Sequence, residues 1–197
     1  MSGWFLSGQA VGDEAAPRFL FSTGEPTWRG ERIPLPPGFA KDMGWRGFEE
    51  IRFAPGMFEP DSEQFFTYVL AFSLEPGTNT GEEKLKREFL AYYRGLAKAV
   101  LGGKGRTVAT EDFSLTLEKA TVESAPIGAG DVSAYRAELS WIEPFATGKA
   151  QTLHFEIHTW NQGARQAVFA CVSPLTPDQG ALWKSLREIR STFHFGD

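Results

Sequence analysis

Three ionisable residues share one face of a predicted strand and are of the types that could do chemistry. Residues 152–160 (TLHFEIHTW) alternate apolar and polar side chains, and the polar positions include His154, Glu156 and His158. Successive side chains of a strand point to opposite faces, so these three groups lie on one side and the apolar residues between them face the core. Imidazoles and a carboxylate serve in acid–base catalysis and in metal binding.

The spacing of this histidine row limits what it could bind. Residues two apart in a strand are separated by about 6.7 Å and residues four apart by about 13 Å. His154 and His158 therefore cannot both reach one metal ion at bond lengths of about 2 Å. Glu156 with one histidine could supply two ligands, and a third would have to come from another strand. This set defines one hypothesis, a metal-assisted or acid/base enzyme.

A structural interpretation explains the same row. A hairpin over residues 133–160 places Arg136 opposite Glu156 and Glu138 opposite His154. Such cross-strand pairs on a solvated face contribute about 0.2 to 1 kcal/mol each and need no ligand. We therefore interpret the row as a solvated face, with Glu156 mainly the partner of Arg136.

Other catalytic patterns are missing from the sequence. It contains no G-x-S-x-G motif, and its single cysteine, Cys171, lies in the apolar run AVFACV, where a thiolate would be costly. The glycines of residues 102–105 end a predicted helix, so they present carbonyl groups to an anion where a phosphate site needs amides. The sequence predicts no catalytic residue, no metal and no cofactor.

Aromatic residues are the remaining candidates for a binding site. The chain has six tryptophans and 17 phenylalanines, and Trp28 and Trp45 fall in a stretch rich in proline and glycine. Aromatics at a rim can hold a small apolar ligand or a partner protein. More often they fix irregular loops to a sheet, which is the interpretation we favour.

The elements that must position these residues can be read from hydrophobic periodicity. Residues 64–74 are nearly all apolar or β-branched, which predicts a strand covered on both faces. Apolar residues at helical spacing predict a helix over residues 82–101, with Thr80 and Glu83 as a capping box. A second helix is predicted after Thr176, which would cap it.

Four further strands are predicted between the helices. They cover residues 112–121, 133–142, 151–160 and 164–172, and the last two are joined by a turn at Asn161-Gln162-Gly163. Successive hairpins form antiparallel sheets, so we expect an α+β fold, an antiparallel β-sheet with two amphipathic helices packed on it.

Length and composition set the frame for this fold. We expect a single α+β domain over residues 1–197, with 1–62 as an irregular front section rich in proline, glycine and aromatics, and 63–197 as the sheet and helices. A net charge of −5 argues against nucleic acid. No apolar run is long enough to span a membrane. The expected protein is soluble, a monomer or homodimer, and cytoplasmic unless a signal was removed.

Two short runs resemble the PsbP-like family, which includes an extrinsic photosystem protein and small exported bacterial proteins. They are IPLPPGF at residues 33–39 and the closing segment from Leu182-Trp183-Lys184-Ser185-Leu186 to Ser191-Thr192-Phe193. The run EEIRFAPGM at residues 49–57 looks like one found in uncharacterised bacterial proteins. The resemblance implies a PsbP-like fold, export, and a non-enzymatic binding or assembly module that engages a protein partner or small apolar ligand.

Overall fold

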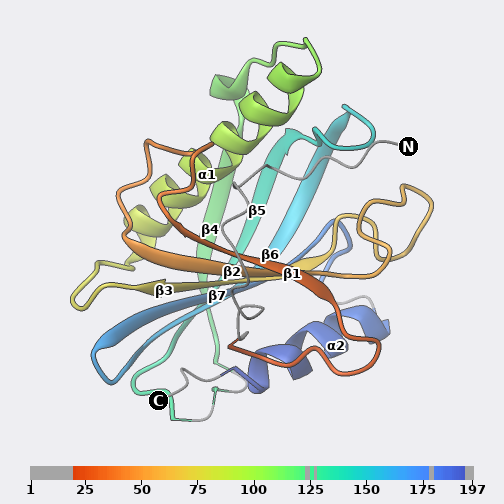
Figure 1. Cartoon of the computed structure of the whole chain (residues 1–197). Helices are drawn as coiled ribbons and strands as arrows, with labels where there is room; N and C mark the ends of the chain where they lie inside the picture. Colours follow the sequence, from red (N-terminus) through yellow and green to blue (C-terminus); the bar gives the residue numbers. More distant parts are fainter. Residues whose placement is uncertain (1–19, 123–124, 127, 178–179, 194–197) are drawn as a thin grey trace, which may run out of the picture.

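A computed structural model describes residues 20–122, 125–126, 128–177 and 180–193 and shows one seven-stranded antiparallel sheet (Figure 1). The strands are β1 (Arg29–Leu35), β2 (Gly47–Phe53), β3 (Tyr68–Leu74), β4 (Ser114–Ala120), β5 (Ser133–Ile142), β6 (Ala150–Gln162) and β7 (Arg165–Ser173). Their order across the sheet is β1-β2-β3-β7-β6-β5-β4. Helix α1 (Glu82–Gly103) packs on one face and α2 (Gly180–Ser191) on the other, which confirms the predicted α+β class.

The hairpins among the last four strands form as predicted. The β5–β6 register pairs Arg136 with Glu156 and Glu138 with His154. Strand β6 continues to Gln162, so the turn to β7 lies slightly later than predicted, and its Gly163 has a φ of +59°. Alternation of apolar residues fixes this register, because a slip of one residue would move every core side chain to the opposite face.

The front section contributes more regular structure than expected. Strands β1 and β2 pair over seven residues each, and β2 in turn pairs with β3, so residues 29–35 and 47–53 extend the main sheet. Proline and glycine are frequent in this stretch of sequence, and they interrupt the alternating pattern by which strands are predicted. Two irregular connections remain, residues 36–46 between β1 and β2 and residues 54–67 between β2 and β3.

Strand β3 lies within the sheet, between β2 and β7, and all seven of its residues are buried. On the α1 face, Leu70 and Phe72 belong to the larger core cluster with Phe89 of α1. On the α2 face, Val69 and Ala71 belong to a second cluster. Both faces of the strand are covered, as its continuous apolar sequence predicts.

Helix α1 has the predicted position but not the predicted cap. Its N-cap residue is Gly81, which has no side chain to bond to the first turn, so Thr80 and Glu83 do not form a capping box. Instead, the Asn79 side-chain oxygen accepts a hydrogen bond from the Gly81 amide. The glutamates at the start of the helix, Glu82 and Glu83, still suit its dipole.

Helix α2 begins at Gly180, four residues after Thr176. Residues 178–179 lie outside the described part of the chain, so the predicted cap at Thr176 stays a prediction. The buried stripe comprises Trp183, Leu186 and Ile189, with Arg190 among them. Neither helix within the described residues has the combined length and hydrophobicity of a membrane span.

Candidate functional site

The histidine row lies on the face of the sheet that α2 covers. Glu156 is buried, and its carboxylate accepts a hydrogen bond of 2.7 Å from Arg187 Nη2 and one of 3.2 Å from Arg190 Nη1. The prediction of a solvated face, with Glu156 mainly the partner of Arg136, is therefore wrong. Arg136 is its register neighbour, but α2 supplies the two arginines that bind the carboxylate.

The charge state of Glu156 follows from these contacts. Burial by itself would raise the pKa of this carboxyl, but the hydrogen bonds and charges of Arg187 and Arg190 outweigh burial and hold the pKa below its usual value. Glu156 is thus an ionised group whose oxygens are already occupied. Such a group is a poor general base and a poor metal ligand.

His158 lies beside this ion cluster and is 3% exposed. Burial first, and then the charge of Arg190, lower the pKa of His158 to about 4, so the imidazole is neutral near pH 7. The adjoining cavity, lined by Arg136, Glu156, His158 and Arg190 among others, measures only about 20 Å³. That is room for about one water molecule and not for a substrate.

His154 of the row and Cys171 of the neighbouring strand β7 also have structural roles. His154 Nδ1 lies 3.4 Å from a Glu138 oxygen, as the cross-strand register predicts. Cys171 is buried on the same face, and burial raises the pKa of its thiol to about 12. In the ranges that the structure describes, no three histidine, cysteine or acidic side chains are grouped so that they could hold a metal ion.

Both tryptophans of the front section are buried. Trp45 is 1% exposed and packs edge-on against Phe72 and Phe89, while Trp28 is 7% exposed in the α2-side cluster. They fix the front section to the sheet, as our favoured interpretation has it. Neither tryptophan lines the cavity beside His158 or the larger groove along α1.

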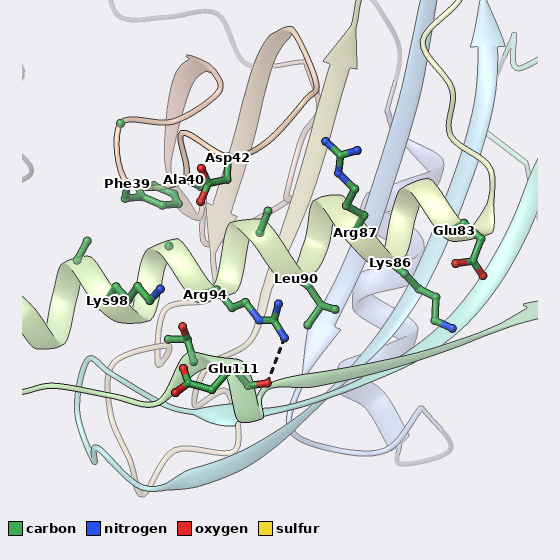
Figure 2. A pocket seen from close by; sticks show the side chains of 15 residues that line it. Phe39, Ala40, Asp42, Glu83, Lys86, Arg87, Leu90, Arg94, Lys98 and Glu111 are labelled. Atoms are coloured by element: carbon green, nitrogen blue, oxygen red, sulfur yellow. Dashed lines mark hydrogen bonds between the residues drawn. The ribbon is translucent and has the colours of Figure 1, made fainter.

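A groove of about 1060 Å³ runs along the outer side of α1 (Figure 2). In Figure 2, Phe39, Ala40 and Asp42 lie on one side of the helix and Glu111 on the other. The lining includes four basic side chains, Lys86, Arg87, Arg94 and Lys98, against three acidic ones, Asp42, Glu83 and Glu111. We call this feature the α1 groove.

The first wall of the α1 groove, residues 38–42, packs directly on the helix because Gly95 has no side chain. A Cβ at Gly95 would lie 2.3 Å from the carbonyl oxygen of Phe39 and 3.0 Å from Ala40 Cβ. The Phe39 ring meets Tyr92 edge-on, with ring centroids 5.1 Å apart. Glu88, buried under this wall, accepts hydrogen bonds from the Gly44 and Trp45 amides. The wall is therefore a fixed part of the fold.

The second wall is the short 3-10 helix η1 (Thr110–Asp112). The Arg94 Nη2 atom donates hydrogen bonds to the carbonyl oxygens of Glu111, at 3.3 Å, and Phe113, at 2.9 Å. Arg94 thus holds this wall and leaves its positive charge in the floor of the groove. Both walls are preorganised by contacts within the chain.

The cations form a row along the helix. Lys86, Leu90, Arg94 and Lys98 recur every four residues, so they follow one side of α1. Lys98 is exposed and Lys86 is partly exposed. The row concentrates positive charge on a molecule whose net charge is −5. These basic side chains would attract an acidic ligand to the α1 groove.

Our reading of the sequence missed this site, although one signal for it was present. A basic residue or leucine at every fourth position of α1 marks a second stripe beside the apolar one. The walls come from residues 38–42 and 110–111, which are distant in sequence, so no local pattern could show that the stripe lies in a groove.

Comparisons of the chain with protein-family models, with curated proteins and with solved structures find no match. The interpretation of the site therefore depends on its own geometry and charge.

Proposed function

We propose that the protein is a non-enzymatic binding or assembly module, and that the α1 groove binds an acidic segment of a partner protein. The observation that carries the proposal is the row of basic side chains in a preorganised groove on an acidic chain. The lining contains no histidine, cysteine or serine, and its most numerous functional groups are basic and acidic side chains suited to binding a charged ligand. The resemblance to PsbP-like proteins, which are mostly assembly or binding modules, supports the same role.

The dimensions of the row define the expected ligand. Lys98 follows Lys86 by twelve positions, which corresponds to about 18 Å along a helix. An extended segment of about five or six residues covers that length. Leu90 adds apolar surface between the charges, and Phe39 adds apolar surface in one wall. We therefore expect acidic residues on both sides of an apolar one, a pattern that favours a peptide over a small apolar ligand.

Fluorescence anisotropy with a labelled peptide tests the proposal. The probe has about ten residues, a central phenylalanine flanked by aspartates and glutamates, and its control carries lysines in place of the acids. Binding of the acidic peptide is expected at about 50 mM NaCl and should weaken strongly at about 500 mM, because surface charges are screened. The lysine peptide should not bind to the groove.

A pair of matched variants locates the binding. In the groove variant, Lys86→Gln with Lys98→Gln, affinity should fall about tenfold, because each exposed ion pair contributes up to about 1 kcal/mol. The control variant, Lys119→Gln with Lys184→Gln, removes the same charge from exposed positions outside the groove and should bind normally. Equal loss in both variants, or tighter binding to phosphatidylserine vesicles than to the peptide, would overturn the proposal.

A further inference from the structure

The chain carries on its own surface a segment with the chemistry that the α1 groove selects. Residues 58–63 (FEPDSE), within the connection between β2 and β3, contain three acidic residues and no basic one. Glu59, Asp61 and Glu63 are exposed, and Phe58 is 53% exposed. Among the described residues, only Phe58 and Val122 are exposed large hydrophobic side chains. We call residues 58–63 the acidic loop.

Backbone hydrogen bonds hold the acidic loop. The Phe66 amide donates to the Met57 carbonyl oxygen at 2.9 Å and closes the base of the loop. In addition, the Glu59 amide donates to the Gly56 carbonyl oxygen, and the Ser62 amide donates to the Glu59 carbonyl oxygen. A preorganised loop loses less conformational entropy on binding than a flexible segment does.

The acidic loop lies away from the groove of its own chain. The Phe58 ring packs on Phe53 and Phe145, at centroid distances of 5.9 and 5.8 Å. None of residues 54–67 lines the α1 groove. The groove wall at residues 38–42 precedes β2 and the acidic loop comes after it, so the two lie toward opposite ends of a strand whose seven residues span about 23 Å.

We infer that the α1 groove of one copy binds the acidic loop of a second copy. This inference rests on the proposed function and names the partner segment. Three carboxylates would face the row of basic side chains, and Phe58 would meet the apolar surface of Leu90. The two surfaces differ, so the contact is head-to-tail and builds either a closed ring or an open chain of copies.

Sedimentation velocity measures this association directly. At about 50 mM NaCl the average mass should rise above the monomer mass of 21.8 kDa as the concentration increases from about 10 µM to about 1 mM. At about 500 mM NaCl it should return to the monomer value. A monomer at every concentration would overturn the inference.

Two variants that each inactivate one surface show whether the contact is head-to-tail. The groove variant is Lys86→Gln with Lys98→Gln, and the loop variant is Phe58→Ala with Glu59→Gln and Asp61→Asn. Each alone should be monomeric under conditions in which the parent chain associates. Mixed, they should form a heterodimer of twice the monomer mass, because the groove variant retains the loop and the loop variant retains the groove.

The outcomes separate this inference from the proposed function. If the acidic peptide binds to the groove and the chain still stays monomeric, self-association is refuted and the proposed function stands. If neither binding is seen, both fail. Association that survives both sets of substitutions, or a mixture that stays monomeric, would show that copies do not meet through these two surfaces.

Discussion

Glu156 ties α2 to the sheet through two arginines. Its carboxylate bonds to Arg187, which is partly exposed, and to Arg190, which is 2% exposed. Removing one member of a buried ion cluster leaves the others without compensation. We therefore expect Glu156→Gln to lower the free energy of unfolding by about 3 kcal/mol, measured by urea denaturation.

Salt dependence and a matched control test this explanation. The loss should persist at high salt, because buried charges are poorly screened. Arg136→Gln, at the exposed register neighbour of Glu156, should change stability by less than about 0.5 kcal/mol. A small, salt-sensitive effect of Glu156→Gln would instead fit a solvated carboxylate and contradict the structure.

The position of these residues shows which part of the site was predictable. Alternation along β6 was enough to predict that Arg136 lies opposite Glu156 and Glu138 opposite His154. It could not show that α2 covers this face, because helix docking depends on contacts far apart in sequence. One signal did exist: Arg190 interrupts the buried stripe of α2, and a buried arginine needs an anionic partner.

At the scale of elements, the α1 groove depends on the close packing of the residue 39–40 backbone against α1. Gly95 lies where the backbone of residues 39–40 touches the helix. In a helix interior alanine is normally favoured over glycine by about 1 kcal/mol. At Gly95 the new Cβ would overlap the Phe39 carbonyl oxygen, which is backbone and cannot rotate away.

Gly95→Ala should therefore destabilise the protein by about 1 to 3 kcal/mol, despite the better helix propensity. Gly102→Ala is the matched control, since no atom lies within 4 Å of a Cβ there, and it should be neutral or stabilise by up to about 1 kcal/mol. Thermal and urea melts of both variants decide the matter. Equal stabilisation by the two alanines would mean that the wall does not pack on Gly95.

The elements themselves were the most predictable level. Periodicity located α1, α2 and five of the strands, since each buries a regular face. Strands β1 and β2 were missed because residues such as Gly30, Pro34 and Gly47 break the pattern that identifies a strand. Gly30 and Pro34 are tolerated because β1 is an edge strand and pairs only with β2.

At the scale of the whole molecule, stability should depend on pH through Glu49 of β2. Burial raises the pKa of Glu49 to about 8, with the Tyr92 hydroxyl opposing the shift and Glu31 adding to it. One Glu49 oxygen accepts a hydrogen bond from Tyr92 at 3.1 Å, and the other has no partner among the described residues. The folded protein therefore holds a proton that the unfolded chain releases above its ordinary pKa of 4.5.

The sign of the effect follows from this difference in bound protons. Between pH 4.5 and about 8 the folded state binds more protons through Glu49, so stability falls as pH rises, by up to about 1.4 kcal/mol per pH unit. His158 acts in the opposite sense: its pKa falls from 6.5 to about 4, so its contribution is complete above pH 6.5 and is lost toward pH 4. The two slopes oppose each other below pH 6.5.

We therefore expect the unfolding free energy to decline most clearly between pH 6.5 and about 8. Glu49→Gln, which cannot ionise, should remove most of that decline and should be more stable than the parent chain at about pH 8. Urea denaturation at a series of pH values measures both effects. A parent chain whose stability is constant or rises over this interval would show that Glu49 is ionised in the folded protein.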